Sequence, residues 1–347
     1  MSDMYKREDV SDSKIELTIT MPRDAFEKSY KALLKDQTKD KDIKGFRKGK
    51  VPEDLIEPSM KPMLQFETFE RLAPMYINTT IQKEKIELVA PPKYSKLPEF
   101  NGDEDLEFKV EVTTMPDFKL GNLKKVKVEK EDIEIEEKDV EKVLKELKTQ
   151  HETDAKKIGD DWAKEMAKKL ELEDVKDLDG FKEKVEDLLK KQKEHMLLHR
   201  YQEDALKQAI ELSKIEIPEG AIEFEAKERE RSFEQDMQAR GVKIEEFLKQ
   251  SNLDMEQMRE AWKKDAKDAL EADVFLNLYA KEKDVKVSKE ELDEKIEMIK
   301  KTQPNADESV FSNEQWLDYI KRVEKKEKAF REFIKETLGE ELLDEHN

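Results

Sequence analysis

The stretch KIELTITMPRDAFEKSYKALL, residues 14–34, changes its apolar period half-way along. Ile15, Leu17 and Ile19 alternate with polar residues, which predicts a strand with one buried face. Pro22 then opens a helix expected to end near residue 39, because proline is preset for the first helical turn. A strand followed at once by an amphipathic helix predicts an α+β domain at the start of the chain.

The remaining pattern divides the chain into a small α+β part and a large helical part. Helical periodicity is expected across residues 63–81, and strands at IELVAPP (86–92) and within DLEFKVEVTTMP (105–116). We therefore predict a multidomain, mainly α protein: an α+β domain over residues 1–116, an extended connector and short helix over 117–158, a helical body with arms over 159–338, and a flexible tail over 339–347.

The helical part is expected to contain one very long helix. Apolar residues recur at steps of three and four across residues 181–210, which gives a helix of about 30 residues, far above the usual length. We interpret it as an arm. Breaks are expected at LDG (178–180), EIPEG (216–220), Gly241 and Pro304, with further helices over 218–240, 254–280, 288–301 and 313–338.

Composition limits the partners. Charged residues make up 44% of the 347 residues and the formal net charge is −19, so the whole surface does not suit non-specific binding of nucleic acid. There is no cysteine, and the sequence shows neither an apolar run long enough to cross a membrane nor a secretory signal. We expect a cytoplasmic protein without a membrane partner.

One short segment reverses this charge. GFRKGKVP, residues 45–52, joins two predicted helices, the second of which begins at Pro52. It does not match the nucleotide-binding loop, which needs four residues between its glycines and Ser or Thr after the Lys. Each residue has an ordinary structural explanation by itself, but together they suggest an exposed docking tip. Phe46 would fill a pocket, while Arg47 and the lysines would bind an anionic surface.

GFRKGKVP closely resembles the ribosome-docking signature of the bacterial trigger factor family, chaperones that wait where nascent chains leave the ribosome. The strand at 15–20, EKIELVAPP, LEFKVEVTTMPDFKLGNL and IEIPEGAI resemble other parts of that family in order. The resemblance implies an ATP-independent chaperone that docks at the exit tunnel, on a ribosomal protein and adjacent ribosomal RNA, and shields nascent or unfolded polypeptides. The residues it assigns to docking are Gly45, Phe46, Arg47, Lys48, Gly49, Lys50 and Pro52.

The family typically carries a prolyl isomerase domain of the FK506-binding-protein type, which this sequence lacks room for. VEKVLKELKTQ resembles the helix that leads into that domain, and only HETDAKKIG separates it from DDWAKEMAKKLELED, which resembles the start of the arms. So few residues cannot build a sheet around an aromatic pocket. We expect no isomerase activity, no catalytic residue and no cofactor.

Two further clusters are weighed. Methionine thioether side chains adapt to irregular partners, and several lie among phenylalanines here, although apolar helical stripes usually pack against neighbouring helices. The candidates for client contact are Phe224, Phe233, Met237, Phe247, Met255 and Met258. His195 and His199 share the spacing of paired metal ligands, but the metalloprotease pattern is absent, and from spacing alone we expect no metal site.

Two alternatives remain open. The chain could be a ribosome-independent helical holdase or adaptor, in which the loop is incidental. Less favoured is a prolyl isomerase with a cryptic site, since the sequence has no room for that domain. Exposed apolar binding surfaces tend to become buried when no client occupies them. Self-association off the ribosome is therefore a further expectation.

Overall fold

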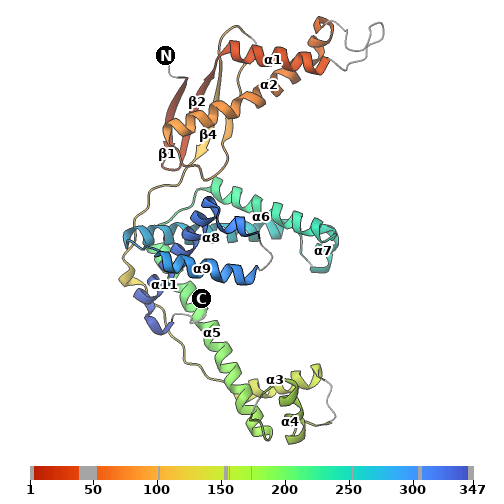
Figure 1. Ribbon diagram of the computed structural model, residues 1–347, viewed down its shortest axis with the longest axis vertical. Helices are drawn as coiled ribbons and strands as arrows, with labels where there is room; N and C mark the ends of the chain where they lie inside the picture. Colours follow the sequence, from red (N-terminus) through yellow and green to blue (C-terminus); the bar gives the residue numbers. More distant parts are fainter. Residues whose placement is uncertain are drawn as a thin grey trace. The chain divides into compact units, whose positions relative to one another are not determined.

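The computed structural model describes residues 4–38, 53–100, 102–151, 155, 157–172, 174–251, 253–303 and 307–342 (Figure 1). The chain divides into two compact units. The first comprises Met1–Asp117 and Glu216–Glu271, and the second comprises Phe118–Ile215 and Ala272–Asn347. Helices dominate, and one small sheet lies in the first unit. The predicted fold class is confirmed. Among the described residues, no helix is both long and apolar enough to cross a membrane.

The sheet has four antiparallel strands in the order β1-β2-β4-β3. They are β1 (Tyr5–Ser11), β2 (Lys14–Met21), β3 (Lys93–Lys96) and β4 (Leu106–Thr113). β2 and β4 pair over their full lengths, with Leu17 opposite Val110, and alternate residues of both are buried. The two strands predicted from a period of two are therefore confirmed.

The two other strands were not foreseen from the pattern. β1 reads YKREDVS and is exposed over most of its length, so it lacks the alternation that would reveal it. The strand expected at residues 86–92 is wrong: within that fully described segment only Leu88 bridges another strand, at Thr114. Pro91 and Pro92 have no amide hydrogen to give to a sheet, and β3 begins directly after them.

Two helices cover one face of the sheet, α1 (Arg23–Thr38) and α2 (Glu53–Glu84) (Figure 1). α1 begins one residue after Pro22, as expected. Phe26 from α1 and Phe69 from α2 are buried with Phe108 from β4. The rings of Phe69 and Phe108 meet edge-on with centroids 5.0 Å apart, a favourable arrangement for aromatic pairs. This core fixes both helices to the sheet.

α2 is one helix of 32 residues that runs through Pro58, Pro62 and Pro74. Proline normally kinks or ends a helix because it removes a hydrogen bond and crowds the preceding turn. All three prolines lie on the exposed side of α2, where water can satisfy the carbonyl groups that lose their partners. The buried side carries Leu64 and Phe69, both fully buried, and this packing holds the helix together across the prolines.

The second unit is organised by α5 (Leu178–Leu212), a helix of 35 residues. The long helix is confirmed, but the break expected at residues 178–180 is wrong. Asp177 caps the helix by accepting a hydrogen bond from the Gly180 amide at 2.9 Å, so LDG forms the first turn. Asp is a preferred N-cap residue, and this signal could have been read from the sequence.

An extended connector, residues 117–136, runs beside α5 and includes a short turn, η1 (Leu123–Lys125). The Gly121 amide donates to Ser213 Oγ at 2.9 Å, and a Cβ at this position would come within 2.5 Å of the Leu212 carbonyl carbon. Gly121 is therefore needed for the close approach. Further along, the Arg200 guanidinium pairs with Glu131 at 2.6 Å. The connector is thus held against α5 at both ends.

The helices after α5 follow the expected ranges closely. They are α6 (Glu219–Ala239), α8 (Met255–Glu282), α9 (Lys289–Thr302) and α11 (Glu314–Leu338), with the short α7 (Ile244–Ser251) and α10 (Glu308–Phe311) in addition. In the second unit, Phe275 and Tyr279 of α8 pack against Phe333 of α11. η2 (Glu340–Leu342) follows α11, and Gln202 of α5 donates to the Leu342 carbonyl at 2.9 Å.

Candidate functional site

The predicted docking residues all lie in the segment that joins α1 to α2. Residues 39–52 include Gly45, Phe46, Arg47, Lys48, Gly49, Lys50 and Pro52, and they fall outside the described residues. The sequence of this segment holds six cationic and two acidic side chains. It is therefore a local cationic patch in a chain whose formal net charge is −19.

The structure does describe the two helices that present this segment, which we call the docking stalk (residues 23–38 and 57–72). A compact cluster of apolar side chains joins them: Leu33 and Leu34 on α1 pack with Met60 and Leu64 on α2. All four are buried. This cluster therefore fixes α1 to α2 on either side of residues 39–52.

A hydrogen bond reinforces the stalk beside this cluster. The Tyr30 hydroxyl on α1 donates to a Glu57 carboxylate oxygen on α2 at 3.1 Å. Burial of the ring, and then the neighbouring Glu57 carboxylate, raises the pKa of Tyr30 to about 12, because both favour the neutral phenol. Tyr30 also stacks on Phe26, with centroids 6.4 Å apart, which connects the stalk to the core above the sheet.

The candidates for client contact lie on α6, α7 and α8 of the first unit. Phe233 on α6 contacts both other helices. Its ring centroid lies 5.6 Å from that of Phe247 on α7 and 5.5 Å from that of Trp262 on α8. Trp262 was missed from the sequence, although it follows Met258 by four residues and so shares its side of α8. These rings pack mainly on one another rather than standing free.

Exposure separates the six candidates. Phe224 is 37% exposed, whereas Met237 is 7% exposed. The other four, Phe233, Phe247, Met255 and Met258, are half-buried. Phe224 is thus the most available for a partner, and Met237 mainly serves packing.

A groove of about 400 Å³ lies between α6 and α8. Trp262 and Ala226 give it apolar wall, and its edges carry charges of both signs. The Arg259 guanidinium pairs there with Glu230 at 2.7 Å. A groove with an apolar wall and charges of both signs at its edges suits an extended peptide better than a small reactive substrate. The residues that line it do not place a nucleophile, a general base or metal ligands in a defined arrangement.

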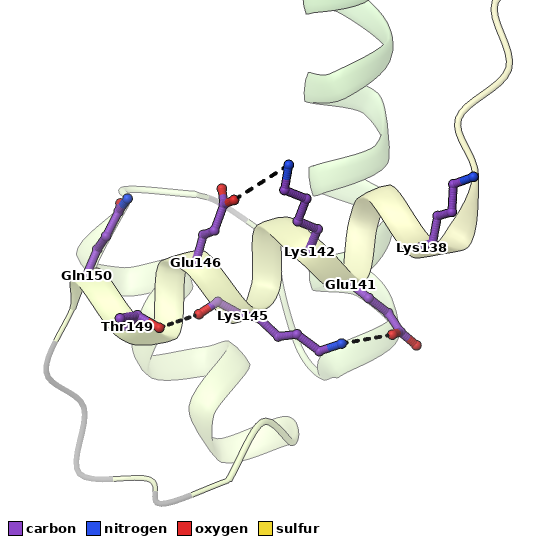
Figure 2. A pocket seen from close by; sticks show the side chains of 7 residues that line it. All are labelled: Lys138, Glu141, Lys142, Lys145, Glu146, Thr149 and Gln150. Atoms are coloured by element: carbon purple, nitrogen blue, oxygen red, sulfur yellow. Dashed lines mark hydrogen bonds and ion pairs between the residues drawn. The ribbon is translucent and has the colours of Figure 1, made fainter.

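A second hollow, on the outer side of α3 (Glu137–Gln150), has no such character (Figure 2). Its side chains all come from one helix, and they pair with each other. Lys145 contacts Glu141 at 3.3 Å and Lys142 contacts Glu146 at 4.0 Å (Figure 2). Exposed pairs at this spacing stabilise a helix slightly. We interpret this hollow as a solvated helix face.

The other side of α3 belongs to a small helical cluster, formed by α3, α4 (Asp160–Lys169) and the first turns of α5. Its core includes Leu144, Trp162, Met166, Phe181 and Val185, all buried. Its core residues lie on both sides of residues 151–159, where an isomerase domain was expected to be missing. We call it the α3–α4–α5 cluster.

Comparison with known protein families now decides the identity. Residues 4–147 match the family model described as bacterial trigger factor protein, and residues 177–335 match the one described as the bacterial trigger factor C-terminus. The chain belongs to the trigger factor family. Only residues 148–176 separate the two matches, so the isomerase domain is absent between them. α4 lies entirely within this intervening segment.

Individual trigger factors agree with this assignment. The trigger factor of Halothermothrix orenii is 22% identical over 385 positions, which span 85% of this chain and 90% of the relative. That of Bacillus cytotoxicus is 24% identical over 378 positions, spanning 82% and 87%. That of Natranaerobius thermophilus is 32% identical over 154 residues, or 44% of this chain and 33% of the relative.

The length of the first alignment also shows how many residues of the relative have no counterpart in this chain. It has 385 positions, whereas 85% of 347 residues is about 295 residues of this chain. About 90 positions of the Halothermothrix orenii protein, the difference between these two numbers, therefore have no counterpart here. A gap of that size is large enough for a domain.

A solved structure shows the same fold. It is described as "Promiscuous Substrate Recognition in Folding and Assembly Activities of the Trigger Factor Chaperone". The match has a TM-score of 0.54 at 16% identity and covers 96% of this chain and 100% of the other. Membership of this family supports a ribosome-associated chaperone function for the chain, and it does not favour the ribosome-independent adaptor.

Proposed function

We propose that this trigger factor docks at the ribosomal exit tunnel through residues 45–52, holds nascent or unfolded segments on its helical arms, and has no prolyl isomerase activity. The observation that carries the proposal is the order of the two family matches, which are separated by only 29 residues. Both the part that resembles the docking domain and the helical body are present, while the enzymatic part between them is not.

Docking is supported by the construction of the stalk. The buried Leu33, Leu34, Met60 and Leu64 side chains join the two helices on either side of the 39–52 segment, so these flanking helices are packed together before any partner binds. A support that is already ordered loses less entropy on association. Phe46 supplies an apolar anchor, while Arg47 and Lys48 add charge that favours a ribosomal protein carboxylate or ribosomal RNA phosphates.

Client holding is supported by the side chains that flank the α6–α8 groove. Phe224 is exposed on α6, and charged residues surround the apolar wall of the groove. Such a surface binds weakly and with little selectivity, because no side-chain pattern demands one partner. The related solved structure is described as showing promiscuous substrate recognition. Tethering at the ribosome raises the local concentration of clients, so weak contacts suffice.

Absence of isomerase activity follows from the missing domain. The residues between the two family matches include α4, whose Trp162 is fully buried against Phe181 of α5, so these two rings offer no aromatic pocket to a proline. A proline-limited refolding assay at catalytic amounts of the protein tests this directly. We expect the same refolding rate with and without it, and a clear acceleration would contradict the proposal.

The docking role is tested by cosedimentation with bacterial ribosomes. Wild type is compared with the triple variant Phe46→Ala, Arg47→Ala, Lys48→Ala, and the matched control removes one exposed aromatic and two exposed cations elsewhere: Tyr319→Ala, Lys321→Ala, Arg322→Ala. We expect wild type and control to pellet and the docking variant to stay in solution. Equal pelleting of all three would refute the assignment of the tip and favour a ribosome-free holdase, with the chain in the cytoplasm in either case.

A further inference from the structure

α5 carries a pair of histidines that neither docking nor client holding uses. His195 and His199 face each other across one helical turn, with their Nε2 atoms 3.2 Å apart and their ring centroids 4.3 Å apart. His195 is exposed and His199 is half-buried. We propose that these two residues form a two-ligand site for a divalent transition metal ion. Spacing alone did not favour a metal, and the distance between the two nitrogens is the new observation.

The distance fits shared coordination of one ion. Imidazole nitrogens bind zinc at about 2.0–2.1 Å. Two nitrogens that are 3.2 Å apart and each about 2.05 Å from the ion subtend an angle of about 100° there, close to the tetrahedral value. The Nε2 atoms are already close enough to share a proton, and an ion would take the place of that proton. Only a small rotation of the two rings is needed.

The described part of the chain supplies two ligands to this site. Among the described residues, no group of three or more His, Cys, Asp and Glu side chains could surround an ion. Water or an outside donor must fill the remaining positions, so the ion is exchangeable. Imidazole favours copper, nickel and zinc, whereas magnesium and calcium prefer oxygen ligands. The site should therefore select Cu²⁺, Ni²⁺ and Zn²⁺ over Mg²⁺.

The position of the pair allows binding without disturbing the second unit. Arg200 and Tyr201 face the connector: Arg200 pairs with Glu131 at 2.6 Å, and the Tyr201 hydroxyl accepts from the Glu131 amide at 2.5 Å. At 100° per residue, His195 and His199 point away from the buried Tyr201. An ion would clamp one turn of α5 from its open side and slow local opening there.

The test titrates the untagged full-length chain with Ni²⁺ and Zn²⁺ by isothermal titration calorimetry, with Mg²⁺ as a reference. The reference is needed because the 86 acidic residues give a weak background for any cation. The variants are His195→Ala and His199→Ala, and the matched control is His151→Ala, which removes a histidine at the end of α3. Alanine favours helix, so circular dichroism should be unchanged.

We expect one Ni²⁺ or Zn²⁺ per wild-type chain, binding at least about tenfold weaker in either α5 variant, and no change in His151→Ala. Hydrogen exchange of α5 amides around residues 195–203 should slow on adding Zn²⁺ to wild type only. The proposal is overturned if Ni²⁺ binds wild type no better than Mg²⁺ does. It is equally overturned if either α5 variant keeps full affinity, or if His151→Ala loses as much as they do.

Discussion

Trp162 packs edge-on against Phe181, with ring centroids 5.5 Å apart and ring planes 74° apart. The first ring comes from α4 and the second from the first turn of α5, and both are completely buried. Trp162 lies between the two family matches and Phe181 lies inside the second one. The contact therefore joins a segment outside the two family matches to the helical body inside the second match.

Replacement Trp162→Ala should destabilise the α3–α4–α5 cluster. Removing a fully buried aromatic ring costs about 3–5 kcal/mol, and the indole Nε1 has no hydrogen-bond partner in the described part of the chain, so the loss is one of packing. Hydrogen exchange should show loss of protection in α3 and α4 while α1 and α2 stay protected. Trp316→Ala, at a half-buried ring on α11, is the control. Equal loss of protection in α1, α2, α3 and α4 would contradict the view that the cluster unfolds independently of the first unit.

Leu64→Ala should weaken ribosome association without touching the docking residues. Leu64 is fully buried, at 0% exposure. Its truncation should lower the free energy of unfolding by about 2–5 kcal/mol because of the cavity it leaves. The stalk would then hold the 39–52 segment less firmly, and the affinity for ribosomes should fall. Leu188→Ala, at a 53% exposed position on α5, should change neither stability nor affinity. If the Leu64→Ala protein were destabilised but bound ribosomes with unchanged affinity, the packing of the stalk would not contribute to docking.

Tyr30→Phe should change how stability depends on alkaline pH. Because the pKa of Tyr30 is raised to about 12 in the folded chain, against about 10 for an ordinary tyrosine, the unfolded chain loses this proton first as the pH rises. The stabilising contribution is therefore complete below pH 10 and is lost between about pH 10 and pH 12. Urea unfolding should show a difference between wild type and Tyr30→Phe that shrinks over this window. A difference independent of pH would contradict the assignment.

Two substitutions on α6 should separate client contact from packing. Phe224→Ala removes an exposed ring and should reduce suppression of aggregation of an unfolded protein, with little effect on stability. Met237→Ala removes a buried side chain and should cost about 2–5 kcal/mol, while the remaining folded protein keeps its activity. Light scattering and urea unfolding on both variants provide the measurements. If Met237→Ala alone abolished suppression at full stability, the roles would be reversed.

Much of this fold could be predicted because its main elements repeat a simple period. Ile15, Leu17 and Ile19 revealed β2, and apolar residues at three- and four-residue steps revealed α5 to within three residues at each end. The errors have physical causes. β1 is charged and exposed, so it shows no alternation, and its pairing with β2 depends on tertiary contact. Helical periodicity was predicted across residues 63–81, whereas burial of Leu64 and Phe69 lets α2 run from Glu53 to Glu84 through three prolines.

The candidate sites were less accessible to sequence reasoning. Trp262 contacts Phe233 only because two helices pack side by side, and no local pattern states which helices do so. Burial of Met237 and exposure of Phe224 depend on the same packing. The docking residues were recognised from their own sequence, and they remain a prediction because they lie outside the described residues.

The α3–α4–α5 cluster also bears on how chains of this family can change length. The end of α3 and the start of α4 are fixed by one shared core, and only residues 151–159 connect them. A chain can gain or lose a folded insert at such a point without rebuilding its neighbours, provided that the ends of the insert lie close together. The cluster makes this connection a natural site for recombination, where a guest domain could be grafted and the chaperone body kept.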